Sequence, residues 1–389
     1  MSNVPVVRVN RKAADRVFSG HPWIFASDVV DRGSAQPGDA VTVADARGKA
    51  LGTAHYSSTS QITLRLLTRR VEPVDRVFLK GSMEAAWRFR QRVVQNSNAY
   101  RLVHAEGDLL PGLIVDRYGD FISLQLLDQG MDRLSTEIVE VLEELLQPKG
   151  IIGRNDVSTR AKENLDADIK VLSGTIPELV DIQMNELRFQ VDLLGGQKTG
   201  VFLDQRENYL AMRRWGRGRA LDCFTGSGGF ALHLASVCDA VEAVDSSALA
   251  ITIAKQNSEL NGIGNVEFRE SNVLDYLPSL VSAKRTFDLV VIDPPAFTKS
   301  RSALEGAVRG YKEINLRALR LLRPGGILVS CSCSHHMSEA HLLEVIAEAA
   351  LDVGKQLRVL ERRTQASDHP VLLTVPETHY LKCLVFEVI

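Results

Sequence analysis

Two cysteine thiols, Cys331 and Cys333, come just after a strand-like apolar run near residue 330. A cysteine at the end of a buried strand can act as a nucleophile when neighbouring cations or hydrogen-bond donors favour its thiolate form. His335 and His336 can assist such a nucleophile, or one of them can cap the helix that follows. The alternative interpretation is a pair of buried, inert thiols. No acidic or cysteine partner lies at zinc spacing, so we expect no metal site.

A glycine-rich turn over residues 220–230 joins an apolar strand to a helix, with the sequence ALDCFTGSGGF. Glycines let the backbone approach a ligand closely and take up positive φ angles. Ligands of open parallel sheets bind beyond the carboxyl ends of the strands, where this turn is expected. Gly226, Gly228 and Ala231 also fit the looser form of the dinucleotide fingerprint. The turn by itself therefore leaves a nicotinamide cofactor open.

Polar side chains follow the next two strands. Asp245 ends the first of them, and its carboxylate can accept both hydroxyl groups of a ribose. Because Ser246, Ser247 and a helix come next, a helix N-cap is the alternative. The other strand ends near Asn272, whose side chain either meets the amine of an adenine or belongs to an ordinary loop.

A fourth strand runs into Asp293, which is followed by Pro294, Pro295, Ala296 and Phe297. Proline fixes the backbone and lacks an N–H donor, so nearby carbonyl groups can be left free to accept from a ligand. The alternative is a simple turn that ends the strand.

The elements that must position these residues are predicted from residue 186 onward. Apolar runs predict strands at 219–223, 240–244, 266–270, 289–292 and 327–330. Helices are predicted between them, at 230–237, 248–260 and 316–322. Strands that alternate with helices imply a doubly wound parallel sheet.

The first half of the chain has a different pattern of predicted helices and strands. Short strand-like runs at 6–9, 40–43 and 61–67, separated by glycine turns, predict a small barrel over residues 1–72. A helix near 80–96, a hairpin at 116–127 and an amphipathic helix over 134–146 predict an α+β module over residues 73–185. The alternating region, residues 186–389, is then a third domain.

Charge is unevenly distributed along the chain. Residues 1–70 carry ten Lys and Arg against five Asp, a net charge of +5, whereas the whole chain carries -2. A basic N-terminal end permits contact with nucleic acid. Trp23, beside the turn at Gly20, is interpreted either as a core residue or as a stacking platform for bases.

Composition excludes several classes of protein. The chain is 45% hydrophobic and 24% charged, which is typical of globular domains. Its five cysteines form no CxxC pair, so a disulfide framework is not expected. No apolar run is long enough for a membrane span, and the first residues lack the apolar region of a signal peptide. We therefore expect a cytoplasmic protein.

These features together resemble the class I S-adenosylmethionine-dependent methyltransferases, and the Asp-Pro-Pro-Ala-Phe run resembles their loop that meets planar nitrogenous rings. More narrowly, the chain resembles the bacterial 23S ribosomal RNA 5-methylcytosine methyltransferases with an N-terminal PUA domain. The resemblance covers essentially the whole chain. Its motifs are RVFSGHPWIF at 16–25, EGD at 106–108, PGLIVD at 111–116, YG at 118–119 and KTGVFLDQREN at 198–208.

The resemblance implies a PUA-like β-barrel, a small α+β domain and a Rossmann-like α/β catalytic domain, and it also implies a homodimer. It implies an S-adenosyl-L-methionine cofactor bound by Asp204, Gln205, Arg206, Asp222, Phe224, Gly226, Gly228, Asp245, Ser246, Asn272 and Asp293. It matches Cys333 to the family nucleophile, with Asp293 beside the target base and Cys331 out of register. The substrate, 23S ribosomal RNA, is then met by Pro294, Pro295, Phe297, Lys12 and Trp23.

The implied reaction adds the Cys333 thiolate to carbon 6 of a cytosine, so that carbon 5 can attack the sulfonium methyl group. The base must leave its stack to reach the site. Many RNA 5-methylcytosine enzymes carry a second cysteine where this chain has Pro295. An N-methyltransferase for an RNA purine, a non-catalytic ribosomal RNA-binding protein and a nicotinamide enzyme are the alternatives.

Overall fold

The computed structural model describes residues 4–195, 201–297 and 304–389. It contains two compact units. The first comprises Met1–Gln183, Val191–Val201 and Ser367–Thr378, and the second comprises Met184–Gln190, Phe202–Ala366 and His379–Ile389. In the described part of the chain, no helix is both long and apolar enough to cross a membrane.

The first unit begins with a six-stranded sheet in the order β2-β6-β5-β4-β1-β3. Its helix α1, Arg11–Phe18, begins where the Asn10 side chain accepts from the backbone of Ala13, and it buries Ala13, Ala14 and Val17. The strands are β1 (Val6–Val9), β2 (Trp23–Phe25), β3 (Val29–Asp31), β4 (Ala40–Ala44), β5 (Ala50–Tyr56) and β6 (Ile62–Thr68). All three runs predicted as strands here are confirmed.

A five-stranded sheet in the order β11-β10-β9-β8-β7 follows in the same unit. Its strands β8 and β9 form the predicted hairpin, and Gly119 in the turn has a φ of 61°. The strands are β7 (Ala99–His104), β8 (Leu113–Tyr118), β9 (Phe121–Leu126), β10 (Gly150–Arg154) and β11 (Ile169–Gly174). The helices are α2 (Arg76–Val93), α3 (Gln129–Arg133) and α4 (Ser135–Leu146), and a separate pair of strands is β12 (Val180–Met184) with β13 (Leu187–Val191).

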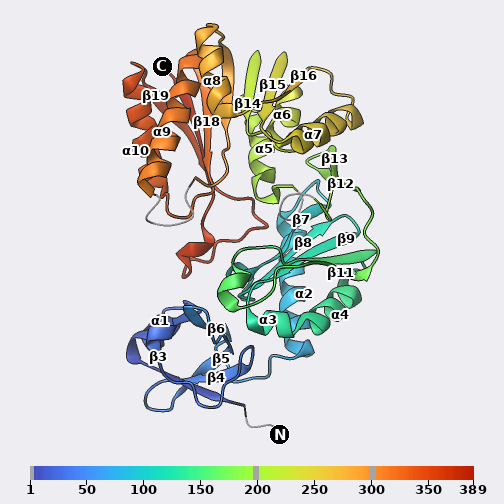
Figure 1. The fold of residues 1–389 in the computed structure, drawn as a ribbon, viewed down its shortest axis with the longest axis vertical. Coiled ribbons are helices and arrows are strands. Elements are labelled where there is room, and N and C mark those ends of the chain that lie inside the picture. The colour runs from blue at the N-terminus through green and yellow to red at the C-terminus, as the bar shows by residue number, and fades with distance from the viewer. Residues whose placement is uncertain (1–3, 196–200, 298–303) are drawn as a thin grey trace. The chain divides into compact units, whose positions relative to one another are not determined.

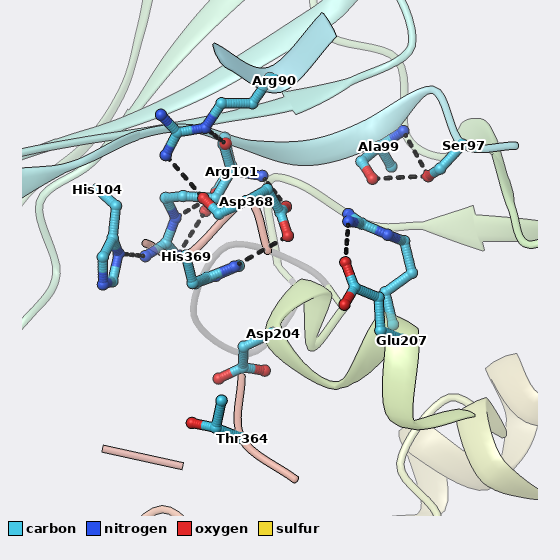
Figure 2. A network of polar contacts seen from close by, with 12 residues as sticks. Arg90, Ser97, Ala99, Arg101, His104, Asp204, Glu207, Thr364, Asp368 and His369 are labelled. Carbon is cyan, nitrogen blue, oxygen red and sulfur yellow. Dashed lines mark hydrogen bonds and ion pairs between the residues drawn. The ribbon is translucent and has the colours of Figure 1, made fainter. Parts of the chain in front are cut away.

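A buried arginine ties a late segment of the chain into this first unit. Arg90 is fully buried, and its guanidinium forms an ion pair with Asp108 and donates to the backbone oxygen of Asp368, 2.7 Å away. The Asp368 carboxylate accepts from the backbone N–H of Arg101 at 2.8 Å. Figure 2 shows Arg90, Arg101 and Asp368 converging in this network. The segment Ser367–Thr378 therefore packs with residues more than 250 positions earlier.

The second unit is built on a seven-stranded sheet in the order β16-β15-β14-β17-β18-β20-β19. Strands β16, β15, β14, β17 and β18 are parallel, and β20 is antiparallel to both of its neighbours. The strands are β14 (Arg219–Cys223), β15 (Ala240–Asp245), β16 (Val266–Glu270), β17 (Phe287–Ile292), β18 (Leu322–Ser332), β19 (Leu357–Arg363) and β20 (Lys382–Val388).

Helices cover both faces of this sheet (Figure 1). On one face lie α8 (Val273–Ser282), α9 (Leu304–Leu321) and α10 (Glu339–Asp352), which share one apolar core with β17, β18 and β20. On the other lie α5 (Arg206–Met212), α6 (Gly229–Ala235) and α7 (Ala248–Leu260). The predicted doubly wound sheet is confirmed. The helix expected at 316–322 is the end of the longer α9, because its amphipathic pattern begins earlier.

Candidate active site

The carboxyl ends of β14, β15, β17 and β18 meet at one edge of the sheet, because these strands are parallel and in register. In the order β15-β14-β17, the first strand of this sheet, β14, has later strands on both sides of it. The chain therefore builds β15 and β16 on one side of β14 and then crosses to build β17 and β18 on the other. Such a switch point is where open α/β sheets hold their ligands. The strand ends therefore bring the predicted site residues together.

The glycine turn after β14 contains residues with positive φ angles, a conformation that lets the backbone approach a ligand closely. Phe224 takes a φ of 66°, and Gly226 and Gly228 take 54° and 92°. Among the described residues, a Cβ atom on Gly226 would meet only the Phe202 ring, at 3.9 Å, so these residues leave the turn open at this point. Gly229, which begins α6, has another reason to be glycine, because its Cβ would lie 2.4 Å from the Tyr209 ring.

Asp222 lies beneath this turn as a fully buried carboxyl group. Its Oδ2 accepts from the Thr225 hydroxyl at 2.6 Å and from the Ala231 backbone N–H at 2.9 Å. Its Oδ1 is buried without a hydrogen-bond partner among the described residues. Burial raises the pKa of the Asp222 carboxyl to about 7, although its two hydrogen bonds act in the opposite direction. Among the described residues, Oδ1 of Asp222 is thus a hydrogen-bond acceptor without a donor, just before the glycine turn.

The end of β15 links directly to the glycine turn. Asp245 accepts from the Gly226 backbone N–H at 3.0 Å and from the Ser247 N–H at 2.9 Å. Ser247, not Asp245, is the N-cap of α7, so the capping alternative for Asp245 is wrong. The half-buried carboxylate has further lone pairs for ribose hydroxyl groups, and Ser246 beside it is exposed.

Asn272 is exposed at the start of α8, where its Oδ1 accepts from the Leu274 backbone N–H at 3.0 Å. It is therefore a helix N-cap, and its side-chain amide nitrogen remains available for other contacts.

The segment at residues 201–208, which leads into α5, contributes to the same edge of the sheet. Gln205 is buried and donates from Nε2 to Oδ2 of Asp293, 3.1 Å away. Asp204 accepts from the Tyr380 hydroxyl at 2.7 Å. Arg206 is buried and lies 3.6 Å from the Glu207 carboxylate. The first three residues of this motif, at 198–200, lie outside the described residues.

The two cysteines differ in environment. Cys331 lies inside β18, fully buried and paired in register with Cys383 of β20. Burial, together with the neighbouring Cys383, raises the pKa of its thiol well above the ordinary value. Cys333 follows the last residue of β18 and is half-exposed, whereas the other four cysteines are buried. Its position makes Cys333 the accessible thiol. His335 and His336 are exposed, and Ser338 caps α10 in their place.

Tyr311 of α9, which the sequence pattern did not single out, lies among these groups. Its hydroxyl is 2.8 Å from Ser332 Oγ and 3.1 Å from Ser334 Oγ, the residues on either side of Cys333. Burial raises the pKa of Tyr311 to about 12, and the charges of Cys333 and Asp293 contribute in the same direction. Tyr311 therefore holds the two serines that flank Cys333.

The residues after Asp293 extend this cluster. The Phe297 ring packs on the Tyr311 ring, with centroids 4.8 Å apart. Pro294 is buried and Pro295 is exposed. The loop thus presents a proline and an aromatic ring beside the thiol-bearing segment, as expected for contact with a planar base.

Lys382 is the second residue that the sequence pattern missed. It begins β20 and is only 4% exposed, with Nζ donating to the backbone oxygens of Ser334 and Tyr380, each at 2.8 Å. Burial of a lysine is unusual, because lysine is almost never fully buried. The sequence shows only a lysine before an apolar run, so it gave no sign of this burial.

Lys12 and Trp23 belong to the first unit. Lys12 is exposed on α1. Trp23 is half-buried, and its indole N–H donates to Glu106 at 2.8 Å. The indole nitrogen thereby links the six-stranded sheet to the turn after β7.

Known proteins match this architecture along its whole length. The family of S-adenosylmethionine-dependent methyltransferases matches residues 142–387, and PUA-like domains match residues 7–69. Two relatives named "Ribosomal RNA large subunit methyltransferase I" match as well. The protein of Klebsiella pneumoniae is 40% identical over 93% of each chain, and that of Salmonella arizonae is 38% identical over 98% of this chain and 96% of the relative. The solved SMU.776 methyltransferase complexed with SAH has the same fold, with a TM-score of 0.85, 20% identity and coverage of 98% and 100%.

The fold and the strand-edge site define a class I S-adenosylmethionine-dependent methyltransferase preceded by a PUA-like domain. Within that class, the chain belongs to the ribosomal RNA large subunit methyltransferase I family. The nicotinamide and non-catalytic alternatives are therefore wrong. The residues present fit the cofactor, since an open glycine turn, the Asp245 carboxylate and the orphaned Oδ1 of Asp222 lie together at the strand edge.

Proposed function

We propose that this protein methylates carbon 5 of a cytosine in large-subunit 23S ribosomal RNA, with Cys333 as the nucleophile. The observation that carries the proposal is the position of Cys333, half-exposed directly after β18 and flanked by Ser332 and Ser334, which both hydrogen-bond Tyr311. The naming of the relatives as ribosomal RNA large subunit methyltransferases supports the substrate class. The basic N-terminal end supports contact with RNA, including contact at Lys12.

Carbon 5 of cytosine is too weak a nucleophile to take a methyl group unaided. The Cys333 thiolate adds to carbon 6, and the electron pair of the 5,6 double bond makes carbon 5 nucleophilic. Bound S-adenosylmethionine supplies the electrophilic methyl group that carbon 5 takes. Removal of the carbon 5 proton then re-forms the double bond and releases Cys333 as a thiolate.

Asp293 is placed to hydrogen-bond the edge of the target base while charge develops on the ring. Gln205 orients that carboxylate through its Nε2. The cofactor contacts proposed above, from Asp222, Asp245 and the glycine turn, orient the methyl donor toward the same edge. We also propose a cytoplasmic homodimer as the working state.

The proposal is tested by methyl transfer from labelled S-adenosylmethionine to ribosomal RNA from a strain that lacks this gene. We expect label in 5-methylcytidine with the wild type and none with Cys333→Ala. Cys331→Ala, at the buried cysteine two residues earlier, is the matched control and should retain activity. Label in a methylated purine that survives Cys333→Ala would contradict the cysteine mechanism and favour an N-methyltransferase, which also suits the Pro294-Pro295 loop.

A further inference from the structure

Lys382 lies directly across the sheet from the segment that carries the proposed nucleophile. Strands β18 and β20 are antiparallel, and Ser332 pairs in register with Lys382. Cys333 is the next residue after Ser332. The Lys382 ammonium group donates to the backbone oxygen of Ser334, the residue on the other side of Cys333. The ammonium group therefore lies against the backbone of Ser334, and the Lys382 backbone lies opposite Ser332.

This ammonium group has little compensation for its burial. Within the described residues, no carboxylate lies within 4.0 Å of Nζ in an ion pair, and its two hydrogen bonds go to neutral carbonyl groups. Among the described residues, Glu339 of α10 and an ionised Cys333 are the groups whose negative charge would raise the pKa of Lys382. Glu339 lies 3.5 Å from Arg362 and so has a cation of its own. A buried ammonium without a carboxylate partner is costly unless another anion is near.

We propose that Lys382 is a positioning residue that holds Cys333 as a thiolate, by serving as the counter-charge of its sulfur. For the reaction itself, this proposal rests on the function proposed above. Lysine or arginine beside a cysteine is a recognised cause of thiolate formation. The Lys382 cation would keep Cys333 in its thiolate form before RNA binds, so no histidine base is needed to remove the thiol proton.

The electrostatics of Lys382 agree with this arrangement. Burial lowers the pKa of Lys382 to about 8, while the negative charges of Cys333 and Glu339 act to raise it. A charge interaction acts equally on both partners, so the sulfur that favours the ammonium is itself favoured as a thiolate. At neutral pH most Lys382 side chains remain protonated, which keeps the cation in place.

Tyr311 completes the support of this segment from α9. Its hydroxyl bonds the side chains of both Ser332 and Ser334, while β20 pairs with Ser332 and Lys382 bonds the backbone oxygen of Ser334. The backbone around Cys333 is thus fixed independently of RNA. Tyr311 stays neutral at ordinary pH because its pKa is raised to about 12. Of the two residues, Lys382 therefore carries the charge.

The test is the pH dependence of alkylation of Cys333 by iodoacetamide, followed by mass spectrometry of the peptide that contains it. In the wild type we expect the midpoint to lie below about 8.5, the value of a free thiol. In Lys382→Met the midpoint should rise by roughly one pH unit, so that alkylation at pH 7 slows about tenfold. Lys382→Arg should restore most of the wild-type rate because it keeps a cation.

Lys355 provides a matched control, because it is a half-buried lysine whose Nζ, like that of Lys382, donates to two backbone oxygens, here those of Leu319 and Leu322. Lys355→Met should leave the alkylation midpoint unchanged. In methyl transfer, Lys382→Met should lower kcat about tenfold and leave KM for RNA nearly unchanged, because thiolate supply falls while the buried lysine does not touch RNA.

A wild-type midpoint at or above that of a free thiol would overturn the proposal, even if Lys382→Met failed to fold. An unchanged midpoint in a folded Lys382→Met variant would also overturn it. The alkylation readout needs no methyl transfer, so it separates this proposal from the proposed function. If wild-type enzyme made no 5-methylcytidine but showed the lowered, Lys382-dependent midpoint, the function would fail and the thiolate pair would stand.

Discussion

Nε2 of Gln205 donates a hydrogen bond to Oδ2 of Asp293 over 3.1 Å, which joins the segment before α5 to the end of β17. Gln205 is buried and also accepts from the Asn208 side chain at 2.7 Å. Its amide is thereby held in one orientation, with the nitrogen toward the carboxylate. Asp293 is half-exposed, so its carboxylate lies where a substrate can reach it.

Gln205→Ala should lower kcat by roughly 10- to 100-fold, because a hydrogen bond to a charged group is worth about 1.5–3 kcal/mol. Asp293 would then lose its orienting partner while keeping its charge. Steady-state methyl transfer to ribosomal RNA measures the effect. Gln356→Ala, at an exposed glutamine of the same unit, should retain wild-type kcat. A Gln205→Ala enzyme with unchanged kcat and KM would show that this bond has no part in the reaction.

Asp245→Ala should weaken cofactor binding by roughly 10-fold or more, because the variant loses an ionised acceptor for ribose hydroxyl groups. The measurement is calorimetric titration with S-adenosylhomocysteine. Asp239→Ala is the control, since Asp239 is an exposed aspartate that precedes the opposite end of β15. Equal affinities of wild type and Asp245→Ala would exclude Asp245 as a ribose ligand.

The strand-edge part of the site could be predicted from sequence because its information is local. Each parallel strand is a short apolar run that ends in a polar or glycine-rich turn, and parallel strands end at one edge. Asp245 and Asp293 could therefore be placed together without any coordinates. The glycine turn alone did not identify the cofactor, since several cofactor classes use the same backbone device.

The support of Cys333 could not be predicted in the same way. Tyr311 lies on the amphipathic helix α9, where its ring follows the ordinary apolar pattern, and only tertiary packing brings its hydroxyl to Ser332. Lys382 reaches the backbone of Ser334, next to Cys333, through the antiparallel pairing of β20 with β18, which joins residues about 50 positions apart. The attachment of Asp368 to Arg90 spans 278 positions and has no local pattern at all.

The last prediction concerns Asp222, whose pKa is raised to about 7 by burial from an ordinary value of 3.8. A carboxyl group with a raised pKa in the folded state binds its proton more tightly there than in the unfolded chain. Its contribution to stability is therefore fully present below pH 3.8 and is lost as the pH rises toward 7. A shift of this size corresponds to at most about 4.5 kcal/mol, at about 1.4 kcal/mol per pH unit.

Asp222→Asn keeps the shape and the acceptor for Thr225 but cannot ionise, so it should remove this pH dependence. We expect the difference in unfolding free energy between variant and wild type to shift in favour of the variant between pH 4 and pH 7, and to level off above that range. Urea unfolding of the cofactor-free protein at a series of pH values measures it. Comparison by difference cancels other titrating groups, including the buried His233, whose pKa is lowered to about 4. A difference that stays constant with pH would mean that Asp222 is already ionised in the folded protein at pH 5, and that its orphaned Oδ1 has a donor in solution.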